Sequence, residues 1–189
     1  MNSGKAPLRF GQYDYGAFIG FISYAGIAMV LPVLLVVMAR DLGFPLEEGN
    51  QGAGGALHLF RSLSMMVMML SASFIASRFG KRLSIALALL VMGTSFAMAA
   101  FSCSYLTLAA AVIVSAAGQG IFEVIITPVV QDLHQGKDAP RYISVTHSFW
   151  PVGVVCIILL AGLALAFGIS WRIIVFCCGM LAIDRKSVV

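Results

Sequence analysis

The sequence predicts an all-α membrane protein built as a bundle of six transmembrane helices. Its composition is the first reason: 60% of the 189 residues are hydrophobic and only 11% are charged, whereas ordinary globular domains are about 45–50% apolar and about 25% charged. The second reason is that the apolar residues gather in long runs. A helix that crosses the roughly 30 Å hydrocarbon core of a bilayer needs about 20 such residues in succession.

The apolar runs divide the chain into six spans joined by short polar loops. Residues 1–14 form a polar segment, and residues 15–183 form the transmembrane domain. The predicted spans are residues 15–39, 52–76, 83–101, 106–130, 142–167 and 171–183. The last run would make about 20 Å of helix, which is too short for the membrane core. We therefore expect a fragment cut inside its sixth helix, with residues 184–189 as a non-native tail.

Lysine and arginine residues lie mostly on one side of the predicted spans, and cytoplasmic loops carry the excess of these residues. The richer side has Lys5, Arg9, Arg78, Lys81, Arg82, Lys137 and Arg141, and the other side has Arg40 and Arg172. This distribution predicts a protein integral to the membrane with a cytoplasmic N-terminus, for which we expect a bacterial inner membrane. The net charge of +4 is therefore a sign of membrane topology and not of nucleic-acid binding.

The fourth predicted span carries polar residues that are costly inside a membrane. Ser115, Gln119, Glu123 and Thr127 recur at every fourth position, so they share one helical face. An ionisable side chain at the membrane centre costs about 2.5–3.5 kcal/mol on insertion scales, and such residues mark functional sites. Glu123 is therefore a candidate for function, whereas Gln119 and Thr127 can equally serve to hold two helices together.

Three other residues of this span concern helix packing. Gly118 and Gly120 are expected to allow close helix contact, and Pro128 is expected to add a kink that neighbouring helices tolerate. The two glycines do not indicate a phosphate-binding loop, because no strand precedes them and they lie within a membrane span.

His147, Arg61 and His58 are further candidates within spans. Glu123 and His147 are expected about 10 and 8 Å from the same membrane face, and consecutive helices are usually neighbours, so a contact between them is feasible. Arg61 lies about 13 Å from the other face, where we expect it to meet a water-filled cavity, an anionic substrate or a carboxylate. It could instead extend outward to the interface. His58, one turn away, suits a structural hydrogen bond as well as a gate.

The connection between the second and third spans resembles the signature of the major facilitator superfamily, Gly-x-x-x-Asp-Arg-x-Gly-Arg/Lys-Arg. The matching residues are Arg78, Gly80, Lys81 and Arg82, while Ser73 and Ser77 replace the glycine and the aspartate. Residues 77–82 are expected to form a short basic conformational loop, in which Gly80 permits a tight turn and Ser77 can only cap a helix. The resemblance implies the N-terminal half of a twelve-helix transporter that works by alternating access, with a C-terminal six-helix half as its missing partner.

Two shorter stretches resemble fucose-permease-like sugar:proton symporters. Residues 118–128 follow that group's pattern Gly-x-Gly-x-x-Glu-x-x-x-Asn-Pro, with Thr127 in place of the asparagine, and residues 147–153 follow its His-x-Phe-x-x-x-Gly run. That group also has an acid in its first helix, whereas residues 15–39 contain none. We expect Glu123 to be the coupling carboxylate, because proton coupling needs a group that gains and loses a proton within the membrane.

These features predict a secondary active transporter that takes up a small polar solute, such as a sugar, together with protons. A drug or metabolite exporter of the same superfamily is an alternative, since an acid in the fourth span and a basic loop would also suit it. A polytopic membrane enzyme or sensor has less support, because His58, His134 and His147 have no metal-ligand spacing and no nucleophilic triad is visible. We expect no cofactor, metal or nucleic acid, and membrane lipids as partners.

Overall fold

A computed structural model of the chain describes residues 8–46, 52–136 and 138–183. The described ranges form six helices: α1 (Gln12–Leu42), α2 (Ala53–Phe79), α3 (Lys81–Ala99), α4 (Tyr105–Leu133), α5 (Ala139–Ala166) and α6 (Trp171–Ile183). In this part of the chain five helices are long and apolar enough to cross a membrane, and α6 is shorter, with 13 residues. The all-helical fold is thus confirmed. The predicted tail, 184–189, lies outside the described residues.

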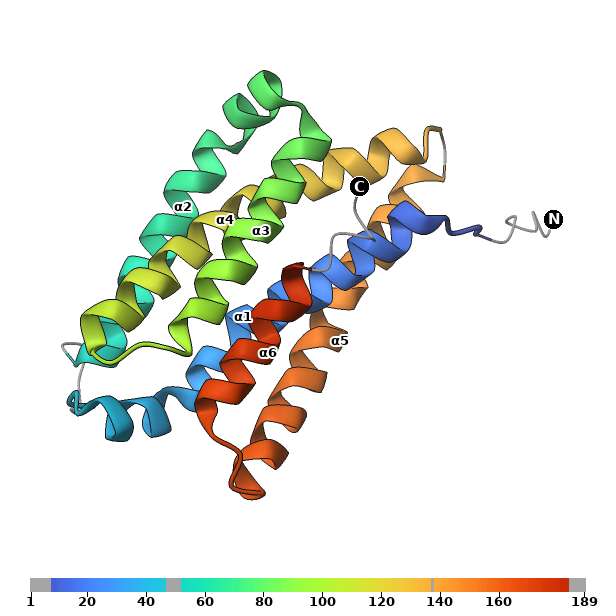
Figure 1. The fold of residues 1–189 in the computed structure, drawn as a ribbon. Helices are drawn as coiled ribbons and strands as arrows, with labels where there is room; N and C mark the ends of the chain where they lie inside the picture. Colours follow the sequence, from blue (N-terminus) through green and yellow to red (C-terminus); the bar gives the residue numbers. More distant parts are fainter. Residues whose placement is uncertain (1–7, 47–51, 137, 184–189) are drawn as a thin grey trace.

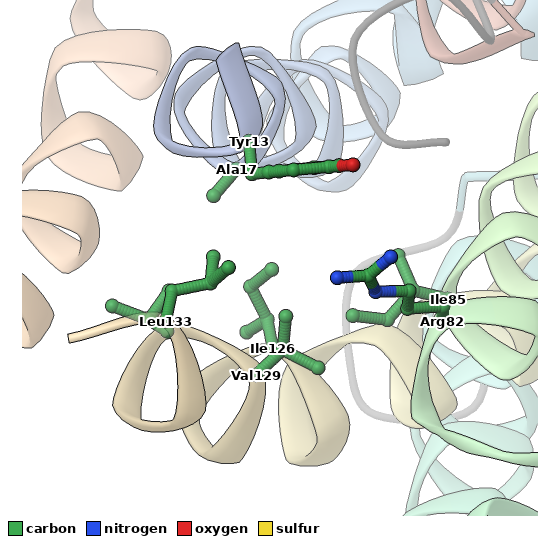
Figure 2. A pocket seen from close by; sticks show the side chains of 8 residues that line it. Tyr13, Ala17, Arg82, Ile85, Ile126, Val129 and Leu133 are labelled. Atoms are coloured by element: carbon green, nitrogen blue, oxygen red, sulfur yellow. The ribbon is translucent and has the colours of Figure 1, made fainter. Parts of the chain in front are cut away.

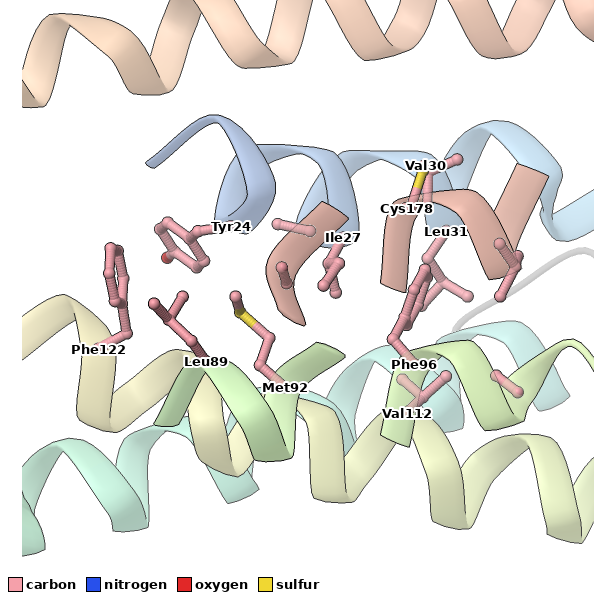
Figure 3. Close-up of a cluster of buried hydrophobic side chains, with 14 of the residues drawn as sticks. Tyr24, Ile27, Val30, Leu31, Leu89, Met92, Phe96, Val112, Phe122 and Cys178 are labelled. Atoms are coloured by element: carbon pink, nitrogen blue, oxygen red, sulfur yellow. The ribbon is translucent and has the colours of Figure 1, made fainter. Parts of the chain in front are cut away.

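The helices pack as two neighbouring groups (Figure 1). In one group α4 lies against both α2 and α3, and in the other α1 lies against α5 and α6. Contacts of α3 with α6 and of α4 with α5 join the groups. The core between them holds large, almost fully buried side chains, among them Ile27, Leu31, Met92, Phe96 and Phe122 (Figure 3). By contrast, α2 and α5 bury few of their residues, so α1, α3, α4 and α6 form the inner part of the bundle.

Two glycines let α4 approach its neighbours closely. A Cβ atom added to Gly118 would lie 2.6 Å from the Ala88 carbonyl oxygen of α3, and one added to Gly120 would collide with the Met65 backbone of α2. Residues two apart lie about 200° apart around a helix, so the two glycines face opposite neighbours. Pro128 lies within α4, near the end of the helix.

The connection between α2 and α3 is shorter than predicted. Residues 77–82 do not form a loop, because Gly80 alone separates the two helices. Its φ of 83° is a conformation that favours glycine, so the chain turns within one residue. Ser77 does not cap α3 either, since its hydroxyl donates to the Phe74 carbonyl oxygen of its own helix at 2.8 Å.

Helix α1 begins a few residues before the predicted first span, residues 15–39. Asp14, assigned above to the polar segment 1–14, lies in the first turn of α1 and is almost fully buried. Its carboxylate accepts a hydrogen bond from the Gly11 N–H at 2.7 Å, which satisfies one of the free donors at the start of the helix. Hydropathy marks only the membrane core of a helix, whereas backbone hydrogen bonding continues into the polar flanks.

Candidate functional site

Glu123 lies on α4 and faces α1. Its side chain interacts with Tyr24 of α1, a residue only 7% exposed. The Glu123 Oε2 atom is buried and has no hydrogen-bond partner in the described part of the chain. An unpartnered carboxylate oxygen in such a place is costly, and native structures rarely leave one without a reason. Glu123 is thus held from one side by a tyrosine and left with free acceptor capacity.

Arg61 extends from α2 toward the same face of α4. Its Nη2 atom donates a hydrogen bond of 2.7 Å to Oε1 of Gln119, and Gln119 is only 1% exposed. The guanidinium also interacts electrostatically with Tyr24 and His58. Arg61 therefore lies against α4. Tyr24 is close to both charged groups, since it interacts with Glu123 as well as with Arg61.

A contact between Glu123 and His147 was feasible from the sequence, but no hydrogen bond or ion pair joins them among the described residues. The His147 Nε2 atom lies 3.0 Å from the Thr127 hydroxyl, one helical turn beyond Glu123 toward the end of α4. The ring of Phe21 packs beside the imidazole at 4.7 Å. On the same helix as His147, the indole N–H of Trp150 is buried without a partner among the described residues.

The basic residues after Gly80 contact the start of α1 and the end of α4. Lys81 forms an ion pair of 2.6 Å with Asp132 of α4, and the Arg82 guanidinium lies over the Tyr13 ring of α1 at 5.0 Å. Figure 2 shows Tyr13 and Arg82 on two sides of a cavity of about 20 Å³, enough for about one water molecule. These contacts join the start of α3 to α1 and α4.

A larger groove of about 270 Å³ lies beside this connection. Ser73 and Ser77 of α2 line it together with Lys81, and Pro128 lines it from α4. Arg78 is exposed. Of the matching signature residues, Lys81 thus borders this groove together with Ser73 and Ser77.

Two interactions at the end of the bundle where α1 begins were missed by sequence reasoning. A ring nitrogen of His134 lies 2.6 Å from the Asp14 carboxylate, and the His134 ring stacks on Tyr142 of α5 at 3.5 Å. They join α1, α4 and α5. Tyr24 was missed as well, because a tyrosine within an apolar run carries no sequence signal of its own. His134 follows α4 directly, and this position was the one available hint.

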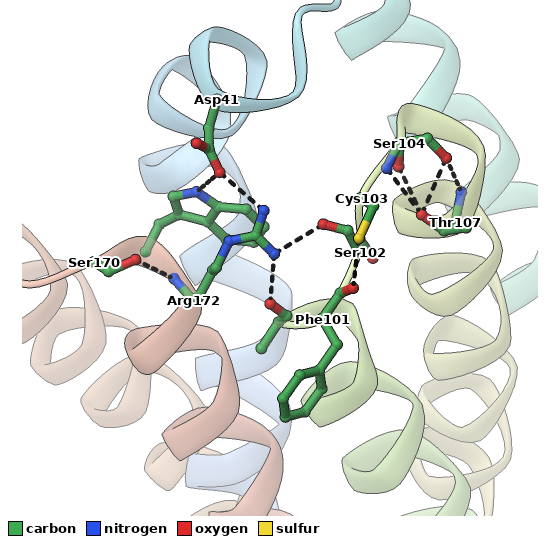
Figure 4. Close-up of polar contacts among 10 residues, drawn as sticks. Asp41, Phe101, Ser102, Cys103, Ser104, Thr107, Ser170 and Arg172 are labelled. Atoms are coloured by element: carbon green, nitrogen blue, oxygen red, sulfur yellow. Dashed lines mark hydrogen bonds and ion pairs between the residues drawn. The ribbon is translucent and has the colours of Figure 1, made fainter.

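The opposite end of the bundle is tied together by Arg172 (Figure 4). Its guanidinium donates to the Asp41 carboxylate at 3.0 Å, and to the carbonyl oxygens of Ala100 and Ser102 at 2.8 Å each. The indole N–H of Trp171 donates to the same Asp41 carboxylate at 3.0 Å. Arg172, at the start of α6, therefore links that helix to the end of α1 and to the turn between α3 and α4.

The described residues contain no group of three or more histidine, cysteine, aspartate or glutamate side chains placed to hold a metal ion. A comparison with functionally characterised proteins finds no significant match. Residues 16–183, however, match the sequence profile of the Major Facilitator Superfamily, so nearly all of the helical bundle is covered. On the six-helix fold, the apolar spans and this match, the chain belongs to the Major Facilitator Superfamily, whose members are secondary transporters integral to membranes.

Proposed function

We propose that the chain takes up a small polar solute, such as a sugar, together with protons, and that Glu123 is the coupling carboxylate. The observation that carries the proposal is the state of Glu123 within α4. It has a tyrosine on one side and a buried, unpartnered oxygen on the other. A carboxylate in this setting can take up a proton without first breaking an ion pair, which suits a group that must load and release protons as access alternates.

The polar groups near Glu123 suit recognition of a polar solute. Arg61 approaches α4 from α2 and donates to Gln119 of α4, and His147 approaches α4 from α5 beside Thr127 of α4. The site therefore offers donors and acceptors on three helices within a mainly apolar bundle. Such a combination of few, convergent polar groups is typical of small-molecule sites.

The surfaces of α2 and α5 support a second helical unit as partner. In the described ranges α2 buries only Gly54, Leu57 and Ala72, and α5 buries only four of its 28 residues. Within a membrane these faces contact either lipid or other helices. We propose that a C-terminal six-helix unit covers them and that lipids cover the remainder.

The lysine and arginine distribution supports a cytoplasmic N-terminus, and we propose the bacterial inner membrane as location.

Transport assays with the full-length protein in proteoliposomes test this function. Uptake of radiolabelled sugars and sugar acids is measured with and without an inward proton gradient, for the unchanged protein, Glu123→Gln and Glu123→Asp. The control variant is Asp138→Asn, which removes an exposed carboxylate outside the spans. We expect gradient-driven uptake to be lost in Glu123→Gln, retained in part in Glu123→Asp and unchanged in the control. Gradient-driven uptake at the normal rate in Glu123→Gln would refute the proposal.

A further inference from the structure

Arg61 is a cation within a membrane span that has no counter-ion in the described structure. The described residues form four ion pairs, and neither Arg61 nor Glu123 takes part in any of them. The one hydrogen bond found for Arg61 goes to a neutral amide, the Oε1 atom of Gln119. A guanidinium has five N–H donors, so most of its capacity is unused there.

The groups around Arg61 do not neutralise its charge. Tyr24 and His58 are the ionisable groups that interact with it electrostatically, and neither is a carboxylate. An arginine within a membrane is costly unless it pairs with an anion or faces water. The guanidinium fork fits a carboxylate through two parallel hydrogen bonds, so the missing partner has the chemistry of a carboxylate or a similar planar anion.

Arg61 and Glu123 do not form an ion pair with each other, although Tyr24 interacts with both. The guanidinium instead donates its hydrogen bond to Gln119, which lies one turn from Glu123 on α4. The site therefore holds a cation, Arg61, without a counter-ion, and a carboxylate oxygen of Glu123 without a hydrogen-bond donor. A solute that carries both an anionic group and hydroxyl groups would satisfy the two together.

We infer that the transported solute is a small hydroxylated carboxylic acid, such as a sugar acid, whose carboxylate binds Arg61 and whose hydroxyl groups reach Gln119 and Glu123. The inference rests on the proposed function and narrows its substrate class. It also balances charge, because one carboxylate anion bound at Arg61 and one proton bound at Glu123 move together without net charge. The crossing then avoids most of the electrostatic cost of carrying a charged solute through the membrane.

Matched pairs of compounds that differ only in a carboxylate test the inference. Suitable pairs are glucuronate and glucose, gluconate and sorbitol, and lactate and propane-1,2-diol, with sodium chloride as the salt control. Binding is measured as thermal stabilisation of the detergent-solubilised full-length protein across a concentration series. The variants are Arg61→Gln and Arg61→Lys, with Arg40→Gln as control, since Arg40 is an exposed arginine at the end of α1.

We expect at least one acid to bind about tenfold more tightly than its neutral partner, a difference of about 1.4 kcal/mol. The preference should vanish in Arg61→Gln, persist in part in Arg61→Lys and stay unchanged in Arg40→Gln. Stabilisation by none of the acids, equal stabilisation by the neutral partners, or an acid preference that survives Arg61→Gln would overturn the inference. Glu123→Gln separates the two proposals, because it should abolish proton-driven uptake while the acids still bind.

Discussion

Two polar pairs at the same end of the bundle have equal lengths but unequal burial, and they should contribute differently to stability. His134 and Asp14 lie 2.6 Å apart with side chains 17% and 4% exposed. Lys81 and Asp132 also lie 2.6 Å apart, but they are 43% and 61% exposed. The variant His134→Ala leaves a buried carboxylate oxygen without its partner, and hydrogen bonds to charged groups contribute about 1.5–3 kcal/mol. An exposed pair such as the second contributes about 0–1 kcal/mol.

We therefore expect His134→Ala to lower the free energy of unfolding by about 2–3 kcal/mol, including the lost stacking on Tyr142. Lys81→Ala should lower it by less than about 1 kcal/mol. The assay is equilibrium unfolding of the full-length protein in mixed micelles by SDS, followed by circular dichroism. His134→Gln, which keeps a donor, should recover part of the loss. Equal losses in the two alanine variants would refute the reasoning, because burial would then not govern these contacts.

Other parts of the bundle lead to three more expectations. Gly118→Ala should lower the free energy of unfolding by about 1–3 kcal/mol, because the added Cβ overpacks the contact with α3. Gly162→Ala is the control and should not lower it, since its Cβ meets nothing within 4 Å. A larger loss in Gly162→Ala than in Gly118→Ala in the SDS assay would contradict this. Arg172→Ala should speed amide hydrogen exchange at the start of α6, and unchanged exchange would show that its hydrogen bonds do not fasten that end. Tyr24→Phe should lower proton-driven uptake about tenfold by releasing Glu123, a loss of about 1.4 kcal/mol, and uptake at the normal rate would exclude a role for the hydroxyl.

The helices could be predicted from the sequence because a membrane span must be apolar over its whole length. The sixth run, residues 171–183, coincides with α6, and the glycines of α4 were identified as sites of close packing. The family could be recognised from Arg78, Gly80 and their neighbours, since these residues are adjacent in the sequence. Features that depend on a single helix or on adjacent residues were therefore within reach.

The partners of the polar side chains could not be predicted, because they depend on how each helix is rotated about its axis. Where almost every side is apolar, as in α1, the sequence does not show which side faces the core. Tyr24 therefore could not be placed against Glu123, and the sequence did not show that His147 lies beside Thr127. The tight turn at Gly80 was predicted, but the helical state of the residues on both sides of it was missed, because their charges are typical of a loop.

Coupling of solute flow to proton flow is the most direct test of the role of Glu123. Full-length protein is reconstituted into proteoliposomes that enclose a pH-sensitive dye, with no initial pH difference, and an inward gradient of each sugar or sugar acid is applied. With the solute that is taken up, the unchanged protein should acidify the interior, and Glu123→Gln should carry the solute without acidification. Acidification by Glu123→Gln at the same rate, or solute entry without acidification in the unchanged protein, would contradict proton coupling through Glu123.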